Sequence, residues 1–123
     1  MVNRMLTKVE EGGLCPADGI DIESMRRAAE QACGLLKALG NPDRLLLLCQ
    51  MTQGEFCVSE LEALTGIRQP TLSQQLGVLR DEQLVRTRRE GKQIYYSIAS
   101  REAMAVMEVL CELYCKTMKE SKS

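Results

Sequence analysis

Residues 59–80 read SELEALTGIRQPTLSQQLGVLR, and this stretch decides the fold. Ser59 and Glu62 match a capping box, which predicts that a short helix begins there. Thr65-Gly66-Ile67 then forms a turn, and Pro70 opens a second helix of about three turns. A short capped helix, a turn that contains glycine and a second helix are typical of a helix-turn-helix.

The second helix of this motif has an apolar face and a polar face. Leu72, Leu76 and Leu79 recur at three- and four-residue steps, which predicts that they are buried. The opposite face carries short or flexible polar side chains, which can hydrogen-bond base edges in the major groove of DNA. The candidate base readers are Gln69, Thr71, Ser73 and Gln74, and the candidate flank or backbone contacts are Gln75 and Arg80.

Two short strands are expected directly after the helix-turn-helix. Residues 84–89 contain β-branched side chains, and residues 94–98 alternate in the pattern of a half-buried strand. The turn between them and its flanks carry Arg88, Arg89 and Lys92. A basic hairpin at this place predicts a wing that grips phosphates or the minor groove.

Charge supports this interpretation through its distribution rather than its total, which is −1. Residues 68–101 hold seven basic and three acidic residues, so this segment carries +4 and the rest of the chain −5. A basic stripe on an otherwise acidic protein suits phosphate binding. The alternative is an unevenly charged surface that binds nothing.

Further helices are expected on both sides of the motif. The first runs from about Asp21 to Leu39, and the next starts with Asn41 as its cap and Pro42 at its first position. This next helix is apolar nearly all round, which predicts that it is buried. A last helix follows a cap at Ser100 and continues to about residue 118. The fold class is therefore mainly α with a small β-hairpin, a winged helix-turn-helix.

The 123 residues fit one domain. Residues 1–20, which include Cys15, are expected to form a flexible tail, and residues 21–119 the DNA-binding and dimerisation domain. Apolar surface left over on the first and last helices favours a homodimer built from those two helices. Neither a signal-peptide pattern nor a membrane-spanning run is present, so we expect a cytoplasmic protein with no membrane partner. Its six cysteines would stay mostly reduced there.

Three stretches resemble a known family. They are residues 36–44, LKALGNPDR, residues 69–80, QPTLSQQLGVLR, and residues 88–96, RREGKQIYY. Together they resemble the ArsR/SmtB family of winged-helix repressors, over about residues 24–118. The resemblance implies a homodimer that binds an inverted-repeat operator in double-stranded DNA and represses transcription until an inducer arrives.

Cysteine and histidine positions bear on the identity of that inducer. Arsenic-sensing members of the family carry three cysteines before the recognition helix, where this chain has Cys57 together with Ser59 and Glu62. Zinc-sensing members use histidine and carboxylates on the last helix, and this chain contains no histidine. Neither of these metal sites is expected, and we expect no cofactor.

The positions of Cys49 and Cys115 resemble the persulfide- and redox-sensing branch of the family. That branch carries one cysteine on the second helix and one near the end of the last helix. The resemblance implies a dithiol switch in which one thiolate attacks the outer sulfur of a reactive sulfur species and the other captures it as a disulfide or longer bridge. Bridging then releases operator DNA and derepresses genes for sulfur oxidation or sulfide detoxification.

Other readings of the cysteines stay open. A general redox sensor that responds to peroxide would use the same pair. Cys111 and Cys115 lie four residues apart on one helix face and offer two thiolates to a soft metal, with Cys33 as a conceivable partner, but no third ligand is evident. Cys33, Cys57 and Cys111 are otherwise interpreted as packing residues.

The remaining function classes are disfavoured by composition. A Cys-His nucleophile pair is impossible without histidine, and neither a phosphate-binding glycine loop nor a paired-carboxylate motif is present, so we expect no enzyme. An interaction domain that has lost DNA binding is the other class, and Arg80, Arg88, Arg89 and Lys92 argue against it.

Overall fold

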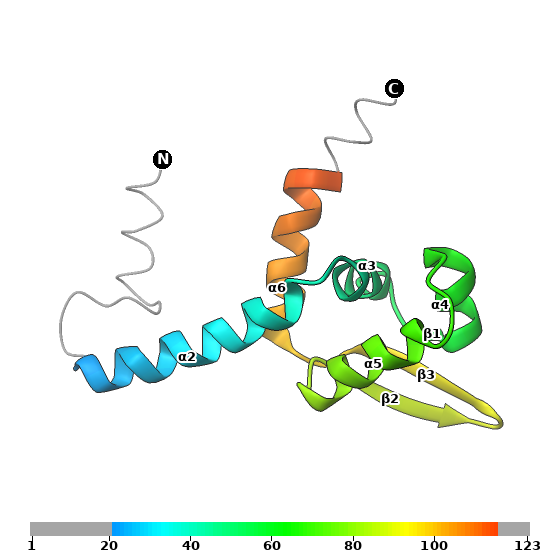
Figure 1. Ribbon diagram of the computed structural model, residues 1–123, viewed down its shortest axis with the longest axis horizontal. Coiled ribbons are helices and arrows are strands. Elements are labelled where there is room, and N and C mark those ends of the chain that lie inside the picture. Colours follow the sequence, from blue (N-terminus) through cyan, green and yellow to red (C-terminus); the bar gives the residue numbers. More distant parts are fainter. Residues whose placement is uncertain (1–20, 116–123) are drawn as a thin grey trace. The chain divides into compact units, whose positions relative to one another are not determined.

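The computed structural model describes residues 21–115 (Figure 1). The chain divides into two units, with the boundary between Lys37 and Ala38. Most of α2 (Ile22–Leu39) belongs to the first unit. The carboxylate of Asp21 accepts a hydrogen bond from the Ser24 amide at 2.9 Å, which lowers the pKa of Asp21 and closes the first turn of the helix. The predicted first helix is thus confirmed, whereas the predicted tail with Cys15 lies outside the described residues.

α3 (Pro42–Met51) begins as predicted. The side-chain oxygen of Asn41 accepts hydrogen bonds from the amides of Asp43 and Arg44, which no helical carbonyl can pair. The prediction that this helix is buried is confirmed at Leu47 and Leu48 and is wrong at Leu46, which is 45% exposed. α3 packs against α4, α5 and β3, and Leu46 lies on the part of its surface that these elements leave exposed.

The helix-turn-helix consists of α4 (Val58–Thr65) and α5 (Thr71–Asp81). Gly66 ends α4 with φ 79°, in the left-handed region that glycine occupies without strain, and its amide donates to the carbonyl of Glu62. Both helices pack against α3, so the three form one helical layer in the second unit.

A three-stranded antiparallel sheet completes the winged helix. β2 (Val85–Glu90) and β3 (Gln93–Ile98) form the predicted hairpin, whose turn contains Gly91 at φ 64°. β1 (Phe56–Cys57), which was not predicted, pairs with the free side of β3 and gives the order β1-β3-β2. Figure 1 shows the hairpin extending past α5, the position of a wing beside a recognition helix.

The last helix, α6 (Arg101–Leu110), starts at Ser100, whose hydroxyl accepts from the Ala103 amide at 3.0 Å as its sequence predicts. From Cys111 to Cys115 the backbone continues as a π-helix, η1, instead of the expected α-helix. The predicted continuation to residue 118 lies outside the described part of the chain.

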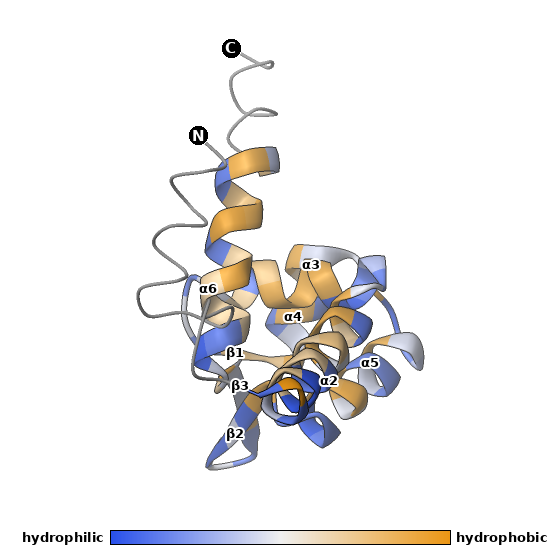
Figure 2. Cartoon of the chain, turned by 90° about the vertical axis from the view of Figure 1, so that its left-hand side faces the viewer, coloured by the Kyte–Doolittle hydropathy of each residue, from blue (hydrophilic) through white to orange (hydrophobic). Residues whose placement is uncertain are grey.

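The core of the second unit lies between the helical layer, the sheet and α6. Its fully buried large side chains are Leu47, Leu48, Met51, Leu61, Leu72, Leu76, Leu79 and Met107. The predicted inner face of α5 is thereby confirmed. Figure 2 shows hydrophobic residues along α3 and mainly hydrophilic ones along β2. Within residues 21–115, no helix combines the length and hydropathy needed to cross a membrane.

The predicted start of α4 is displaced by two residues. Cys57, in extended backbone, precedes the first helical residue, and its amide donates to the carboxylate of Glu60 at 2.9 Å. Glu60 therefore fills the role that Glu62 was expected to fill for Ser59. The reason is β1, because pairing with β3 holds Cys57 extended until the helix begins.

Candidate functional site

Three thiols meet where α3 faces η1. The Sγ atom of Cys49 lies 3.5 Å from the Sγ atom of Cys111, and the Sγ atoms of Cys49, Cys111 and Cys115 all lie within 4.8 Å of one another. Cys49 and Cys111 are half-buried, and Cys115 is exposed. The two predicted sensor cysteines are thus side by side, and Cys111, which sequence reasoning interpreted as a packing residue, adds a third thiol.

Helix geometry explains the cluster. Cys49 follows the buried pair Leu47 and Leu48, which fix α3 in the core. On the other side, buried Met107 anchors α6 one turn before Cys111. In the wider π-helical turn, residues four apart still lie on nearly the same side, so Cys111 and Cys115 both face α3.

The cluster strongly disfavours the charged form of Cys49. Burial, then the hydrogen bond with Cys111, then the proximity of the other two sulfurs raise the pKa of Cys49 to about 12. A thiolate is poorly solvated there and would sit beside other thiols that become negative when they ionise. Cys49 therefore carries its proton at neutral pH.

The other two described cysteines lie elsewhere. Cys33 is exposed on α2. Cys57 is buried at the start of α4, and its sulfur lies 3.3 Å from the hydroxyl of Ser59. Cys57 therefore has the packing role that its sequence context suggested.

The candidate base readers lie in the first turn of the recognition helix α5 and two residues before its start. Ser73, Gln74 and Arg80 are exposed, and Thr71 is half-buried at the first turn of α5. Gln69 is exposed, but its side-chain oxygen accepts from the Ser73 amide at 3.1 Å. Gln69 therefore also caps α5, because Pro70 at the N-cap has no side-chain oxygen to do so.

Gln75 is half-buried and has a hydrogen-bond partner within the protein. Its side-chain oxygen accepts from Nη1 of Arg44 at 2.9 Å, and Nε of Arg44 donates to the carbonyl of Ala38 at 2.6 Å. A single guanidinium on α3 thus holds both the recognition helix and the end of α2. Sequence reasoning placed Gln75 as a flank contact with DNA and gave Arg44 no role.

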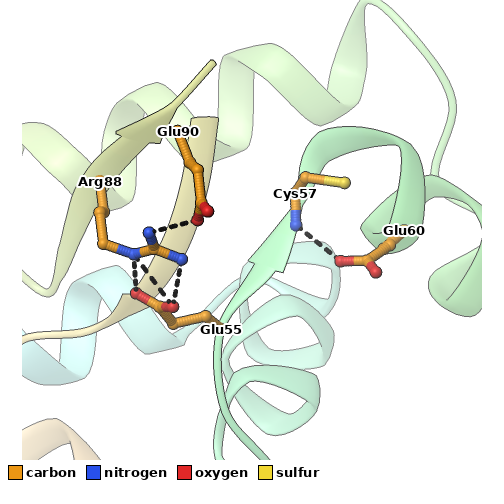
Figure 3. A network of polar contacts seen from close by, with 5 residues as sticks. All are labelled: Glu55, Cys57, Glu60, Arg88 and Glu90. Carbon is orange, nitrogen blue, oxygen red and sulfur yellow. Dashed lines mark hydrogen bonds and ion pairs between the residues drawn. The ribbon is translucent and has the colours of Figure 1, made fainter. Parts of the chain in front are cut away.

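The wing carries a local ion-pair network (Figure 3). Arg88 donates from Nη2 to Glu55 at 2.9 Å and from Nη1 to Glu90 at 2.7 Å, and its guanidinium lies 4.9 Å from the ring centre of Tyr95. Arg88 lowers the pKa of Glu55, so the pair persists at neutral pH and is lost only as pH falls through the lowered value. Arg88 is therefore engaged within the protein, while Arg89 and Lys92 are exposed near the tip.

Comparison with known proteins agrees with this geometry. Residues 41–87 match the family model described as bacterial regulatory protein, arsR family. The chain is 51% identical to a biofilm growth-associated repressor of Agrobacterium fabrum, over 78% of this chain and 82% of that relative. It belongs to the ArsR family.

Solved structures place this ArsR-family protein among BigR and HlyU. The transcriptional repressor BigR of Xylella fastidiosa superposes with a TM-score of 0.71 at 46% identity, covering 78% of this chain and 98% of that one. Reduced HlyU of Vibrio cholerae superposes with a TM-score of 0.73 at 38% identity, covering 76% of this chain and 99% of the HlyU chain. These relatives are transcriptional regulators, so this ArsR-family protein is a DNA-binding regulator and not an enzyme.

A further similar structure concerns assembly. The homodimeric winged helix-turn-helix DNA-binding domain Mb0332 of Mycobacterium bovis has a TM-score of 0.66 at 29% identity, covering 85% of this chain and 94% of that one. This structural neighbour of the ArsR-family protein is thus a homodimer.

Removal of the Glu55 carboxylate is expected to tighten duplex binding. In Glu55→Gln, Arg88 loses its bidentate partner and keeps the contact with Glu90, and the segment before β1 loses one negative charge beside the wing. We expect severalfold higher affinity for a random duplex and a log–log salt slope steeper by about 1, because one more cation meets phosphate. Fluorescence anisotropy over a salt series measures both quantities.

Glu108→Gln is the matched control for that experiment, since it removes the same charge from an exposed position on α6. Equal gains in affinity for the two variants would mean that net charge alone acts, and that the ion pair of Arg88 does not restrain the wing.

Proposed function

We propose that this protein is a cytoplasmic transcriptional repressor that senses reactive sulfur species through Cys49 and Cys115. In the reduced state it holds an inverted-repeat operator, and a bridge between the two cysteines releases the DNA. The genes it controls would serve sulfur oxidation or sulfide detoxification. The observation that carries the proposal is that the two sulfurs lie within 4.8 Å in a BigR- and HlyU-like winged helix.

In the reduced protein, the two sulfurs are close enough for a bridge to form when an oxidising sulfur reagent arrives. A disulfide bond is about 2.05 Å long, so sulfurs up to 4.8 Å apart need only a local adjustment of η1. One or more inserted sulfur atoms reduce that adjustment. Cys115 is the exposed thiol of the cluster, so it is the first that a reagent from solvent meets.

The chemistry balances with a persulfide, RSSH, as the oxidant. The thiolate of Cys115 attacks the outer sulfur, the S–S bond of the reagent breaks, and RS⁻ leaves, so Cys115 becomes a persulfide. The sulfur of Cys49 then attacks the inner sulfur of Cys115, the S–S bond of the persulfide breaks, and the leaving HS⁻ takes the Cys49 proton and departs as H₂S. In total, two protein thiols and one RSSH give one disulfide, one RSH and one H₂S. If a second RSSH converts Cys49 to a persulfide in the same way, its outer sulfur attacks the inner sulfur of Cys115 and HS⁻ leaves. In total, two protein thiols and two RSSH then give one trisulfide, two RSH and one H₂S.

Arg44 supports a route from the thiols to the DNA reader. It lies on the same helix as Cys49 and holds Gln75 of the recognition helix. α3 also packs directly against α5. A displacement of α3 by a bridge at Cys49 would therefore move or release α5 through a defined contact.

Loss of this contact is expected to weaken the coupling and leave the sulfur chemistry intact. In Arg44→Met, persulfide should still bridge Cys49 and Cys115, while the accompanying change in operator affinity shrinks by about 2- to 30-fold, the range for couplings of 0.5–2 kcal/mol. Operator titrations of the reduced and bridged forms measure that change.

Gln75→Ala provides the second side of a double-mutant cycle. If the hydrogen bond carries the coupling, the double variant should resemble either single variant. Fully additive effects would show that the two residues act separately and would contradict the route.

The exposed apolar side chains support a homodimer built from α2 and α6. In the second unit, Val109, Leu113 and Tyr114 are exposed, the last at 66%, and in the first unit Ile22 and Leu36 are exposed on α2. Apolar clusters of this kind mark interfaces, and Mb0332 of Mycobacterium bovis is a homodimer. Sedimentation equilibrium should give twice the 13.8 kDa chain mass, and a monomer at micromolar concentration would contradict the proposal.

The experiment that tests the function combines mass and affinity. The reduced protein is bound to an inverted-repeat duplex selected from a random library, a persulfide donor is added, and the released protein is analysed by intact mass and peptide mapping. A Cys49–Cys115 bridge that forms in step with release supports the proposal. Equal bridging and release by peroxide would make the protein a general redox sensor, and release without a bridge would overturn the dithiol mechanism.

A further inference from the structure

We propose that Cys49, Cys111 and Cys115 together bind a soft, thiol-seeking metal ion in the reduced protein. This ligand is of a different class from reactive sulfur, and the site does not rest on the sulfur-sensing function. Sequence reasoning expected no metal because it left Cys111 and Cys115 without a third ligand. The structure supplies that ligand in Cys49 of α3.

The sulfur positions suit a common ion. With metal–sulfur bonds of about 2.3 Å and tetrahedral angles, as for zinc, ligating sulfurs lie about 3.8 Å apart. Here one pair is 3.5 Å apart and all three lie within 4.8 Å. Closure onto an ion therefore needs shifts of about an ångström, which rotation of the exposed Cys115 side chain can provide.

The donor set decides the class of ion. Three thiolates with no oxygen or imidazole ligand in the cluster select soft ions over magnesium or calcium. The positive charge of the ion offsets the repulsion between thiolates that otherwise opposes their ionisation, and the thiols lose their protons as they bind. Because Cys115 is exposed, an ion can reach the cluster from solvent.

A bound ion and a sulfur bridge exclude each other. Coordination engages the sulfur lone pairs that must attack a persulfide, and a bridge removes two of the three ligands. A cell rich in the ion would thus keep the cysteines from reacting, and oxidation would expel the ion. Cys111 separates the two activities, because the ion needs it and the Cys49–Cys115 bridge does not.

The test uses Cd²⁺ as the probe on the reduced full-length chain without oxygen. We expect one equivalent to bind per chain, with a thiolate charge-transfer band in the ultraviolet. Cys111→Ser should lower the affinity at least ~100-fold, since loss of even an outer-shell partner costs 10- to 100-fold. Cys33→Ser, which changes an exposed cysteine outside the cluster, should bind as the wild type does. Unchanged Cd²⁺ affinity in Cys111→Ser overturns the site.

Alkylation of the wild-type protein gives an answer that requires no variant to fold. Cd²⁺ should protect Cys49, Cys111 and Cys115 from iodoacetamide and leave Cys33 reactive. Alkylation of Cys111 at the same rate with and without Cd²⁺ refutes the site. Persulfide bridging in Cys111→Ser tests the proposed function separately, because that variant keeps both sensor cysteines.

Discussion

Replacement of Cys49 by serine is expected to leave operator binding intact and to abolish release by persulfide. In the wild-type protein, bridging should lower operator affinity by roughly 5- to 150-fold, the usual range for coupled sites. In Cys49→Ser, Cys115 can still become a persulfide but has no partner thiol in the sensor pair. Anisotropy titrations of an operator duplex, before and after treatment with a persulfide donor, measure the ratio of affinities.

The cluster makes the choice of companion variants important. Cys115→Ser should behave as Cys49→Ser does, whereas Cys33→Ser should respond as the wild type does. Because Cys111 lies 3.5 Å from Cys49, it can replace Cys115 as the bridging partner, and a Cys115→Ser variant that still responds points to Cys111. A full response in the Cys115→Ser/Cys111→Ser double variant would refute the dithiol mechanism.

Truncation of Leu72 is expected to cause a large loss of folding stability. Its side chain is completely buried between α5 and the core, so Leu72→Ala removes apolar contacts and leaves a cavity. Such substitutions cost about 2–5 kcal/mol, against a total of about 5–15 kcal/mol for a domain of this size. Urea unfolding of the reduced protein should show a correspondingly lower midpoint.

Leu64→Ala is the matched control, since the same change is made at a leucine that is 56% exposed on α4. Its expected cost is within about 0.5 kcal/mol. Both variants must be compared at one protein concentration, because dimerisation would add a concentration-dependent contribution. Equal midpoints for the two variants would mean that α5 is not held by the core in the way described.

The recognition helix and the hairpin could be predicted because their signals are local. Leucines at helical spacing, an asparagine cap followed by proline, and alternation in residues 94–98 each reflect the chain's own geometry. β1 gives no such signal, since two residues become a strand only through pairing of Phe56 and Cys57 with β3. The displaced start of α4 follows from the same long-range pairing.

In the candidate site, too, the features with a local sequence signal could be predicted and those that depend on long-range packing could not. The helices of Cys49 and Cys115 could be inferred, and the resemblance paired the two residues. The place of Cys111 depends on the π-helical turn and on how α6 meets α3, which no local pattern specifies. One signal was present: Cys111 is four residues from Cys115, so any partner of Cys115 would lie near it too. The engagement of Arg88 by Glu55 required the fold, because 33 residues separate them.

The two ends of α3 have separate roles. Arg44, near its start, holds the recognition helix, and Cys49, near its end, belongs to the thiol cluster. Five residues separate them, about 7.5 Å along the axis. The residues around Cys49 can therefore be substituted to bind a different ligand, while the contact of Arg44 that orients α5 is kept. For protein engineering, this makes the DNA-reading half a reusable part, which new ligands can address through substitutions around one end of a ten-residue helix.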